Sequence, residues 1–322
     1  MLVTKLGFGC ASILGKIDKK NSLYALKLAH EAGINYFDIA RSYGWGEAES
    51  LLGNFLIQEK IYRENVEITT KFGLSPRNNK FIRIAKTLAR NIVNYIPQSQ
   101  TIVKSAAGQV SPKIDFTVKN ATISLNTSLK SLRTDYIDNI LFHGYDFENK
   151  SDDIFEVIEF LEAQKKCGKI RSYGFATYQS IELVNNFFTS QNIKPDILQI
   201  ACGGIGKHDS MTLKNLADKD IKIVMYSPFR IEPSIALIFE QLKDKNLYSE
   251  IESIFGRKFI PQENMHQIIL SYFQRIYSPY AIVISMFNPQ HIKINQQAVQ
   301  QEKVSKEQFE SFERLLILHK II

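Results

Sequence analysis

Eight short apolar runs recur along the chain, each separated from the next by a segment long enough for a helix. Several runs, such as Ile221–Tyr226 and Tyr280–Ile284, are apolar at nearly every position. This pattern is typical of parallel strands that are buried on both faces. The expected strands are Lys5–Gly9, Asn35–Ile39, Val66–Lys71, Tyr136–Phe142, Ile170–Phe175, Asp196–Ala201, Ile221–Tyr226 and Tyr280–Ile284.

The segments between these runs carry helix signals. In Asp152–Lys166, apolar residues recur at i, i+4 and i+7 from Ile154, and Ser151 or Asp152 can serve as the N-cap. A second start signal is Asn288-Pro289, which places asparagine at the N-cap and proline at the first helical position. Strands therefore alternate with helices along the chain.

Eight strands that alternate with eight helices predict an α/β fold of the (β/α)8 TIM-barrel type, which takes roughly 250 residues plus insertions. Strand counting alone leaves a doubly wound sheet open. A dinucleotide-binding Rossmann unit is disfavoured, because the third glycine of the motif that begins at Gly7 would fall at Ser12. No Pro/Ser/Gly-rich linker divides the chain, so residues 1–322 are expected to form a single barrel domain.

Residues 74–115 break this regularity. Connections in α/β units are usually about 2–6 residues long, so this segment is an insertion after the third strand. Its apolar positions from Phe81 to Ile96 mark one face of a helix, and basic residues crowd another. We hypothesise that this basic helix is a lid that favours an anionic or bulky substrate; the alternative is a solvated helix packed on the outer wall. The basic face comprises Arg77, Lys80, Arg83, Lys86 and Arg90.

The net charge of +7 belongs mostly to that insertion. Its seven basic residues and one acidic residue give +6, which leaves the rest of the chain nearly neutral. A nucleic-acid-binding surface is therefore not expected. The longest apolar runs are far too short to span a membrane, and the N-terminus lacks the pattern of a secretory signal, so we expect a cytoplasmic protein.

The cysteine and histidine patterns argue against a metal site. Cys10, Cys167 and Cys202 are odd in number and lack CxxC spacing, which favours a reducing compartment and disfavours disulfides or zinc. We interpret all three as small buried hydrophobic residues. The six histidines show no HExxH spacing, and most are expected on the surface or in packing roles.

Four polar side chains lie where a barrel places its active site, at the C-terminal ends of strands. Asp38 closes the second expected strand, Lys71 closes the third, and His143 closes the fourth. Tyr43 follows Asp38 by five residues in a loop. Each residue alone also has a structural interpretation: a helix cap for Asp38, a solvated strand end for Lys71, a core histidine for His143 and a loop anchor for Tyr43. Together on successive strand ends they favour a catalytic group.

The four residue types suit proton transfer to a carbonyl. A buried charge is costly unless it is paired, so Asp38 is expected to hold Lys71 as an ammonium ion. A nearby ammonium ion would lower the pKa of Tyr43 from the free value of about 10 and make it a better general acid. His143 could donate a hydrogen bond to the same carbonyl oxygen.

The sequence around these residues resembles the aldo-keto reductase family over almost the whole chain apart from the insertion. The first family signature is matched by Gly33–Ala40, Tyr43-Gly44, Glu49 and Leu52-Gly53. The second is matched by Ser128–Asp138 through His143. Further matches are Gly168–Gly174, Gln199, Tyr226–Phe229 and Asn288-Pro289 through Asn295.

The resemblance implies an NAD(P)H-dependent oxidoreductase that reduces an aldehyde or ketone, such as a sugar or an anionic carbonyl compound, to the alcohol. Asp38, Tyr43, Lys71 and His143 would be its catalytic tetrad, with Tyr43 as the general acid. For the cofactor, it implies that Tyr226 stacks on the nicotinamide and Gln199 binds the carboxamide. Ser227 and Phe229 would line the pyrophosphate site.

Four residues depart from the family pattern. Ala176-Thr177 stands where the family usually has Ser-Asn to hold the carboxamide, so Thr177 would replace only part of that contact. Ser285 and His291 occupy the positions that commonly carry Lys and Arg for the 2′-phosphate of NADP. With fewer cations for that phosphate, the choice between NADPH and NADH stays open; we favour NADPH, with NADH as the alternative. The weaker cofactor match also keeps open a non-catalytic, cofactor-sensing protein on the same fold.

Overall fold

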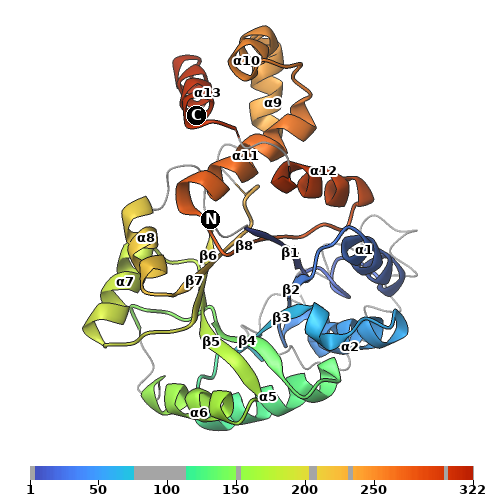
Figure 1. Cartoon of the computed structure of the whole chain (residues 1–322), viewed down its shortest axis with the longest axis vertical. Helices are drawn as coiled ribbons and strands as arrows, with labels where there is room; N and C mark the ends of the chain where they lie inside the picture. Colours follow the sequence, from blue (N-terminus) through green and yellow to red (C-terminus); the bar gives the residue numbers. More distant parts are fainter. Residues whose placement is uncertain are drawn as a thin grey trace, which may run out of the picture.

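The computed structural model describes residues 4–75, 114–149, 154–202, 209–230, 235–300 and 304–321. Eight parallel strands form a closed barrel in the order of the sequence, with β8 pairing back to β1 (Figure 1). This confirms the barrel and excludes the doubly wound sheet, which has two free edges. The strands are β1 (Lys5–Gly9), β2 (Tyr36–Asp38), β3 (Glu67–Phe72), β4 (Ile137–His143), β5 (Ile170–Thr177), β6 (Ile197–Ala201), β7 (Lys222–Tyr226) and β8 (Ala281–Ile284).

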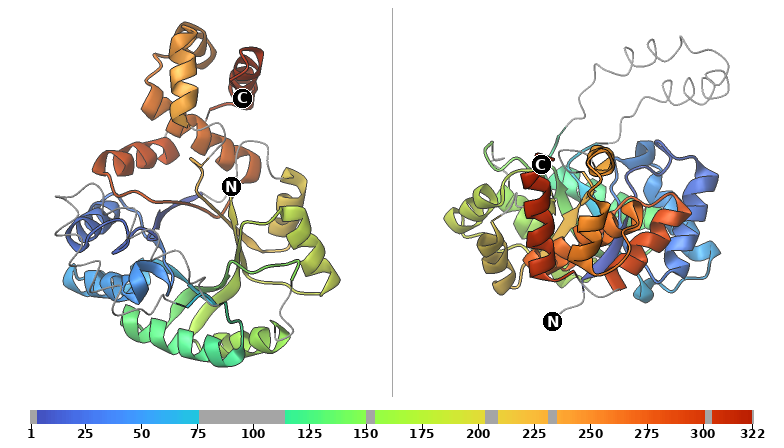
Figure 2. Two further views of the ribbon diagram at one scale, coloured as in Figure 1. Left: turned by 180° about the vertical axis from the view of Figure 1, so that it is seen from behind. Right: turned by 90° about the horizontal axis from the view of Figure 1, so that it is seen from above.

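Helices surround the barrel, and a further layer lies outside one of them. In Figure 1, α9, α10 and α13 lie beyond α11, away from the barrel, and the left view of Figure 2 shows the same arrangement from behind. The helices are α1 (Lys19–Glu31), α2 (Ala48–Gln58), α5 (Val118–Leu132), α6 (Ile154–Lys166), α7 (Ile181–Ser190), α8 (Ser210–Asp218), α9 (Ile235–Asp244), α10 (Tyr248–Phe255), α11 (Pro261–Tyr277), α12 (Pro289–Gln300) and α13 (Lys306–Leu318); η1 (Tyr43–Gly46) and η2 (Arg63–Asn65) are short 3-10 helices.

The eight expected strands are confirmed to within two residues at each end. The start of α12 is also confirmed, because the backbone N–H of Gln290 donates to Asn288 Oδ1 at 3.0 Å. The expected N-caps of α6, Ser151 and Asp152, lie outside the described residues. The expected basic helix of the insertion also lies outside the described residues. Only the base of the insertion is described, where Leu74 and Ile114 form an antiparallel bridge.

The outer helical layer was not predicted. The connection between β7 and β8 holds α9, α10 and α11, instead of one helix. The apolar faces of the added helices pack on other helices, as where Phe255 of α10 meets Phe312 of α13 with ring centroids 5.7 Å apart. Helical periodicity indicates that a face is buried, but it does not say which surface covers that face.

The inside of the barrel is built in layers. An apolar cluster fills it, separate from the larger core between strands and helices, and comprises Tyr36, Leu141, Ala176, Ile197, Val224, Ala281 and Val283. Gly7 makes room for it, since a Cβ there would lie 2.8 Å from the Tyr36 ring. Near the N-terminal ends of the strands, Lys5 Nζ donates to Glu67 Oε2 at 2.6 Å and to Tyr280 Oη at 2.7 Å. An ion pair therefore closes the barrel floor.

Two residues of the first family signature have structural roles. The carboxyl of Glu49 is buried and accepts from Thr70 Oγ1 at 2.6 Å, which fixes α2 to β3. Burial raises the pKa of Glu49. Gly53 allows α2 to approach the end of α5, because a Cβ there would lie 2.6 Å from the carbonyl oxygen of Ser131.

Asp138, in the second signature, is an anchor on the outside of the barrel. It is only 5% exposed and accepts from Arg63 Nη2 at 2.6 Å, from Arg171 Nη1 at 3.0 Å and from the backbone N–H of Ile68 at 2.9 Å. Both guanidinium groups also lie over the ring of Tyr136, at 4.2 and 4.1 Å from its centroid. One carboxylate therefore ties β3, β4 and β5 together.

We expect Asp138→Ala to lower the free energy of unfolding by about 3 kcal/mol, because it leaves Arg63 and a backbone N–H without their shared acceptor. The control is Glu310→Ala, which breaks an exposed i,i+4 pair with Lys306 and should cost under about 0.5 kcal/mol. Urea unfolding followed by circular dichroism measures both. Equal losses in the two variants would contradict the anchoring role.

Candidate active site

The structure brings the four predicted catalytic residues together at the C-terminal end of the barrel. Asp38 and His143 are the last residues of β2 and β4, and Lys71 is the penultimate residue of β3. Tyr43 begins η1, immediately beyond β2. Because parallel strands present their C-terminal ends at one rim, residues far apart in sequence become neighbours there.

Asp38 and Lys71 form a buried ion pair, as the sequence predicts. Lys71 Nζ lies 2.7 Å from Asp38 Oδ1 and 2.8 Å from Oδ2, and it also donates to the carbonyl oxygen of Ile39 at 3.1 Å. Lys71 is 3% exposed and Asp38 is 6% exposed. Burial acts to lower the pKa of Lys71, but interactions with Asp38 and Tyr43 together more than offset it, and the pKa is raised. Lys71 is therefore an ammonium ion at neutral pH.

Tyr43 lies beside that ammonium ion. Lys71 Nζ is 3.5 Å from Tyr43 Oη and 5.2 Å from the centroid of the ring. The expected net lowering of the Tyr43 pKa is not found: burial raises the pKa, and the charge of Lys71 offsets only part of the rise. The phenol is therefore protonated at neutral pH, with a cation placed next to its oxygen.

His143 packs edge-on against Tyr43, with ring centroids 5.8 Å apart and an interplanar angle of 82°. Burial lowers the pKa of His143 to about 3, and the charge of Lys71 adds to that effect. The imidazole is therefore neutral in the physiological range. Its Nδ1 is buried without a hydrogen-bond partner among the described residues.

The loop that carries Tyr43 has an unusual backbone. Gly44 and Trp45 both have positive φ angles, 56° and 60°, which is rare for a residue as large as tryptophan. A Cβ on Gly44 would lie 2.8 Å from the carbonyl oxygen of Ile13, so the loop packs closely on the segment after β1. A cavity of about 280 Å³ opens beside Tyr43 and is lined by Ala11, Gly15, Ser42, Tyr43, Gly44, Trp45, Leu74 and Ser75.

The predicted cofactor residues lie on the other half of the rim, on or just beyond β5 to β8 and on α12. Gln199 on β6 is 2% exposed, and its Nε2 donates to Asp38 Oδ1 at 2.8 Å. Thr177 ends β5, and its hydroxyl donates to the carbonyl oxygen of Tyr145 at 3.4 Å. The single O–H donor of Thr177 is therefore already bound to the protein backbone.

Tyr226 ends β7 and donates from Oη to the carbonyl oxygen of Thr177 at 3.2 Å. Burial raises its pKa to about 12, although Lys71 partly opposes the rise. Ser227 has a positive φ of 58°, so the chain turns sharply as it leaves β7. Ser285, just beyond β8, donates from Oγ to the carbonyl oxygen of Gly9 at 3.2 Å.

The remaining predicted cofactor residues gather around His266, which the sequence analysis did not single out. Phe229 stacks on the His266 ring with centroids 4.2 Å apart, and His291 meets the same ring at 5.8 Å. Asn295 is 1% exposed and its Oδ1 lies 2.6 Å from His266 Nδ1. His266 sits in α11 in no recognisable motif, so only the packing of α11 on α12 reveals it.

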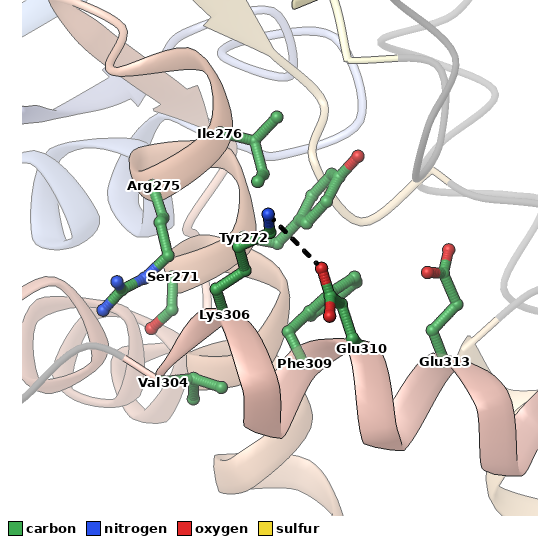
Figure 3. A pocket seen from close by; sticks show the side chains of 9 residues that line it. All are labelled: Ser271, Tyr272, Arg275, Ile276, Val304, Lys306, Phe309, Glu310 and Glu313. Carbon is green, nitrogen blue, oxygen red and sulfur yellow. Dashed lines mark ion pairs between the residues drawn. The ribbon is translucent and has the colours of Figure 1, made fainter.

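A second cavity, of about 250 Å³, lies between α11 and α13 in the outer layer (Figure 3). Its charged lining includes the exposed Lys306–Glu310 pair, and no residue of the predicted active site lines it. Within the described residues no cluster of side chains suits a metal ion, and no described helix is long and apolar enough to cross a membrane.

The prediction for the cysteines is confirmed for two of the three. Cys10 and Cys202 are buried, whereas Cys167 is exposed, so the prediction for Cys167 was wrong. Cys167 follows the last residue of α6 at the turn into β5, where the chain runs over the surface. Burial raises the pKa of Cys10 and Cys202 well above the usual value.

The chain is similar to several known oxidoreductases. The relatives include the oxidoreductase YqkF of Bacillus subtilis, 27% identical over 226 residues that cover 70% of this chain and 61% of YqkF. The aldo-keto reductase YhdN of the same organism is 29% identical over 188 residues, which cover 57% of this chain and 46% of YhdN. The first curated relatives are matched over about half of their length.

Among solved structures, an aldo-keto reductase from Bacillus halodurans in its holo form superposes with a TM-score of 0.69. It is 21% identical and covers 97% of this chain and 92% of its own, which supports the fold. The sequence also matches the Aldo/keto reductase family over residues 5–317. With that match and the barrel in agreement, the chain belongs to the aldo/keto reductase family of oxidoreductases.

Proposed function

We propose that this protein reduces an aldehyde or ketone to the alcohol with NAD(P)H, and that Tyr43 is the general acid. The observation that carries the proposal is the position of the Lys71 ammonium group, which contacts both Asp38 oxygens and lies 3.5 Å from Tyr43 Oη. The cavity that Tyr43 lines is the place where we expect a carbonyl compound to enter.

Several features suit a nicotinamide dinucleotide. Asn295 Nδ2 is buried and has no hydrogen-bond partner among the described residues, so it offers an unused donor. The N-terminus of α12 is the positive end of the helix dipole, which favours an anion nearby. Tyr226 and Gln199 would hold the nicotinamide, Ser227 and Phe229 the pyrophosphate, and Ser285, His291 and Asn295 the adenosine end, with Thr177 near the carboxamide. NADPH is the preferred cofactor, and NADH is the alternative.

The chain's own residues account for the proton. The bound cofactor would supply a hydride to the carbonyl carbon. Tyr43, which is protonated at neutral pH, donates its phenolic proton to the carbonyl oxygen and becomes a phenolate. Lys71 stabilises that new negative charge more than it stabilises the neutral phenol, which is the requirement for lowering the barrier. The neutral His143 ring has one N–H, which can donate to the same oxygen.

Tyr43→Phe should lower kcat/KM for aldehydes by about 10²- to 10⁴-fold, the usual contribution of a general acid, because the ring remains but the proton donor is lost. Assays of NADPH oxidation with a panel of aldehydes measure this change. Cofactor binding, followed by protein fluorescence, should be unchanged. Full activity in the variant would contradict the role of Tyr43, whereas tight cofactor binding without turnover in the wild type would favour the cofactor-sensing alternative.

Lys71→Met should abolish turnover and also lower the free energy of unfolding by about 3–5 kcal/mol, because Asp38 is left as a buried unpaired carboxylate. The matched variant Asp38→Asn/Lys71→Met removes both charges and should recover most of the lost stability while remaining inactive. Thermal and urea unfolding test the pair. A double variant no more stable than Lys71→Met would show that the charge pairing is not what stabilises the site.

The stability of the protein should depend on His143 in acid. Its pKa is about 3 when folded and about 6.5 when unfolded, so the unfolded chain binds the proton first as the pH falls. The free energy of unfolding should therefore decrease below pH 6.5 by about 1.4 kcal/mol per pH unit from this group. Between pH 7 and pH 5, the wild type should lose about 2 kcal/mol more unfolding free energy than His143→Gln, as measured by urea unfolding. An equal loss of unfolding free energy in the wild type and in His143→Gln would contradict a buried neutral imidazole.

A further inference from the structure

Gln199 makes a contact that the expected carboxamide role does not require. Its Nε2 donates to Asp38 Oδ1 at 2.8 Å, and both side chains are buried. Gln199 lies on β6 and Asp38 on β2, which are four strands apart in a barrel of eight (Figure 1). The hydrogen bond therefore crosses the barrel and joins the half of the rim that carries the tetrad to the half that carries the predicted cofactor residues.

The chemistry of Asp38 fixes which way the Gln199 amide faces. A carboxylate can only accept hydrogen bonds, and both oxygens of Asp38 are paired with the Lys71 ammonium group. The –NH₂ group of Gln199 must therefore face Asp38, and Oε1 must face away from it. By contrast, if the partner were a neutral group that can both donate and accept, the Gln199 amide could bind it in either of its two flipped orientations.

We propose that Gln199 is a positioning residue through which the Asp38–Lys71 pair selects the head group of the cofactor. Because Oε1 is an acceptor, it is satisfied by a ring substituent that donates, as the –NH₂ of a carboxamide does, and not by one that only accepts. This inference rests on the proposed function and adds to it a source of selectivity. The charge that prepares Tyr43 also determines which end of the Gln199 amide the cofactor meets.

The test compares the Kd of NADPH with that of its 3-acetylpyridine analogue, in which an acetyl group replaces the carboxamide and removes the donor. Quenching of Trp45, the single tryptophan, reports binding without turnover. We expect the wild type to bind the analogue about tenfold more weakly, since one buried acceptor loses its partner. In Gln199→Leu the two ligands should bind within about twofold of each other.

The variant that isolates the role of Asp38 is Asp38→Asn. The asparagine side chain can donate or accept, so the Gln199 amide is free to turn and the tenfold preference should fall to about twofold, although Gln199 itself is intact. If the unpaired Lys71 prevents folding, Asp38→Asn/Lys71→Met removes the charge and keeps the test. Asn139→Leu, which removes a buried amide from the lower barrel, should leave the preference unchanged.

The outcomes separate the two proposals. Equal affinity of the wild type for NADPH and the analogue overturns the inference about Gln199 and leaves the proposed function standing. A tenfold preference that persists in both Asp38 variants also overturns it, because the orientation would then not depend on the carboxylate. Failure of the wild type to bind either dinucleotide overturns the proposed function together with this inference.

Discussion

The buried ion pair between Asp38 and Lys71 is the constraint on which the site depends. Two charged side chains that are only 6% and 3% exposed are tolerated when close geometry and further hydrogen bonds offset their desolvation. Here both Asp38 oxygens contact Nζ, while Ile39 and Gln199 occupy further positions around the pair. Tyr43 gains its cation only because that pair holds Nζ in place.

The register of the sheet makes this pairing possible. Asp38 lies opposite Thr69 in the β2–β3 ladder, and Lys71 lies two residues further along β3. Because side chains alternate between the two faces of a strand, a shift of two residues keeps Lys71 on the same face as Thr69, which is also the face of Asp38. A slip of one residue would turn Lys71 outward toward the helices and leave Asp38 unpaired.

The barrel interior holds two ion pairs, one at each end. Lys5 and Glu67 lie at the floor, Asp38 and Lys71 lie at the catalytic rim, and the cluster around Tyr36 lies inside the barrel with them. Burial acts to raise the pKa of Glu67, but bonds from Lys5, Asn139 and Tyr280 lower it below its usual value. Burial from water strengthens electrostatic interactions at the rim, where Lys71 acts on Tyr43.

By itself, the sequence predicted the strands and the four residues of the rim, while the resemblance to a known family implied the barrel that the pairing of β8 with β1 closes. Buried parallel strands read as continuous apolar runs, and a polar residue at the end of each run stands out against them, as Asp38, Lys71 and His143 do. Only the tertiary structure decided the rest. No local pattern encodes which distant segments meet or which residues stay exposed. This holds for the outer helices, the contact of His266 with Phe229 and Asn295, the exposure of Cys167 and the hydrogen bond from Gln199 to Asp38. The net rise in the Tyr43 pKa was also decided by the tertiary structure. Burial is a property of the folded chain, and its effect on this pKa outweighs that of the Lys71 charge, which the sequence indicated.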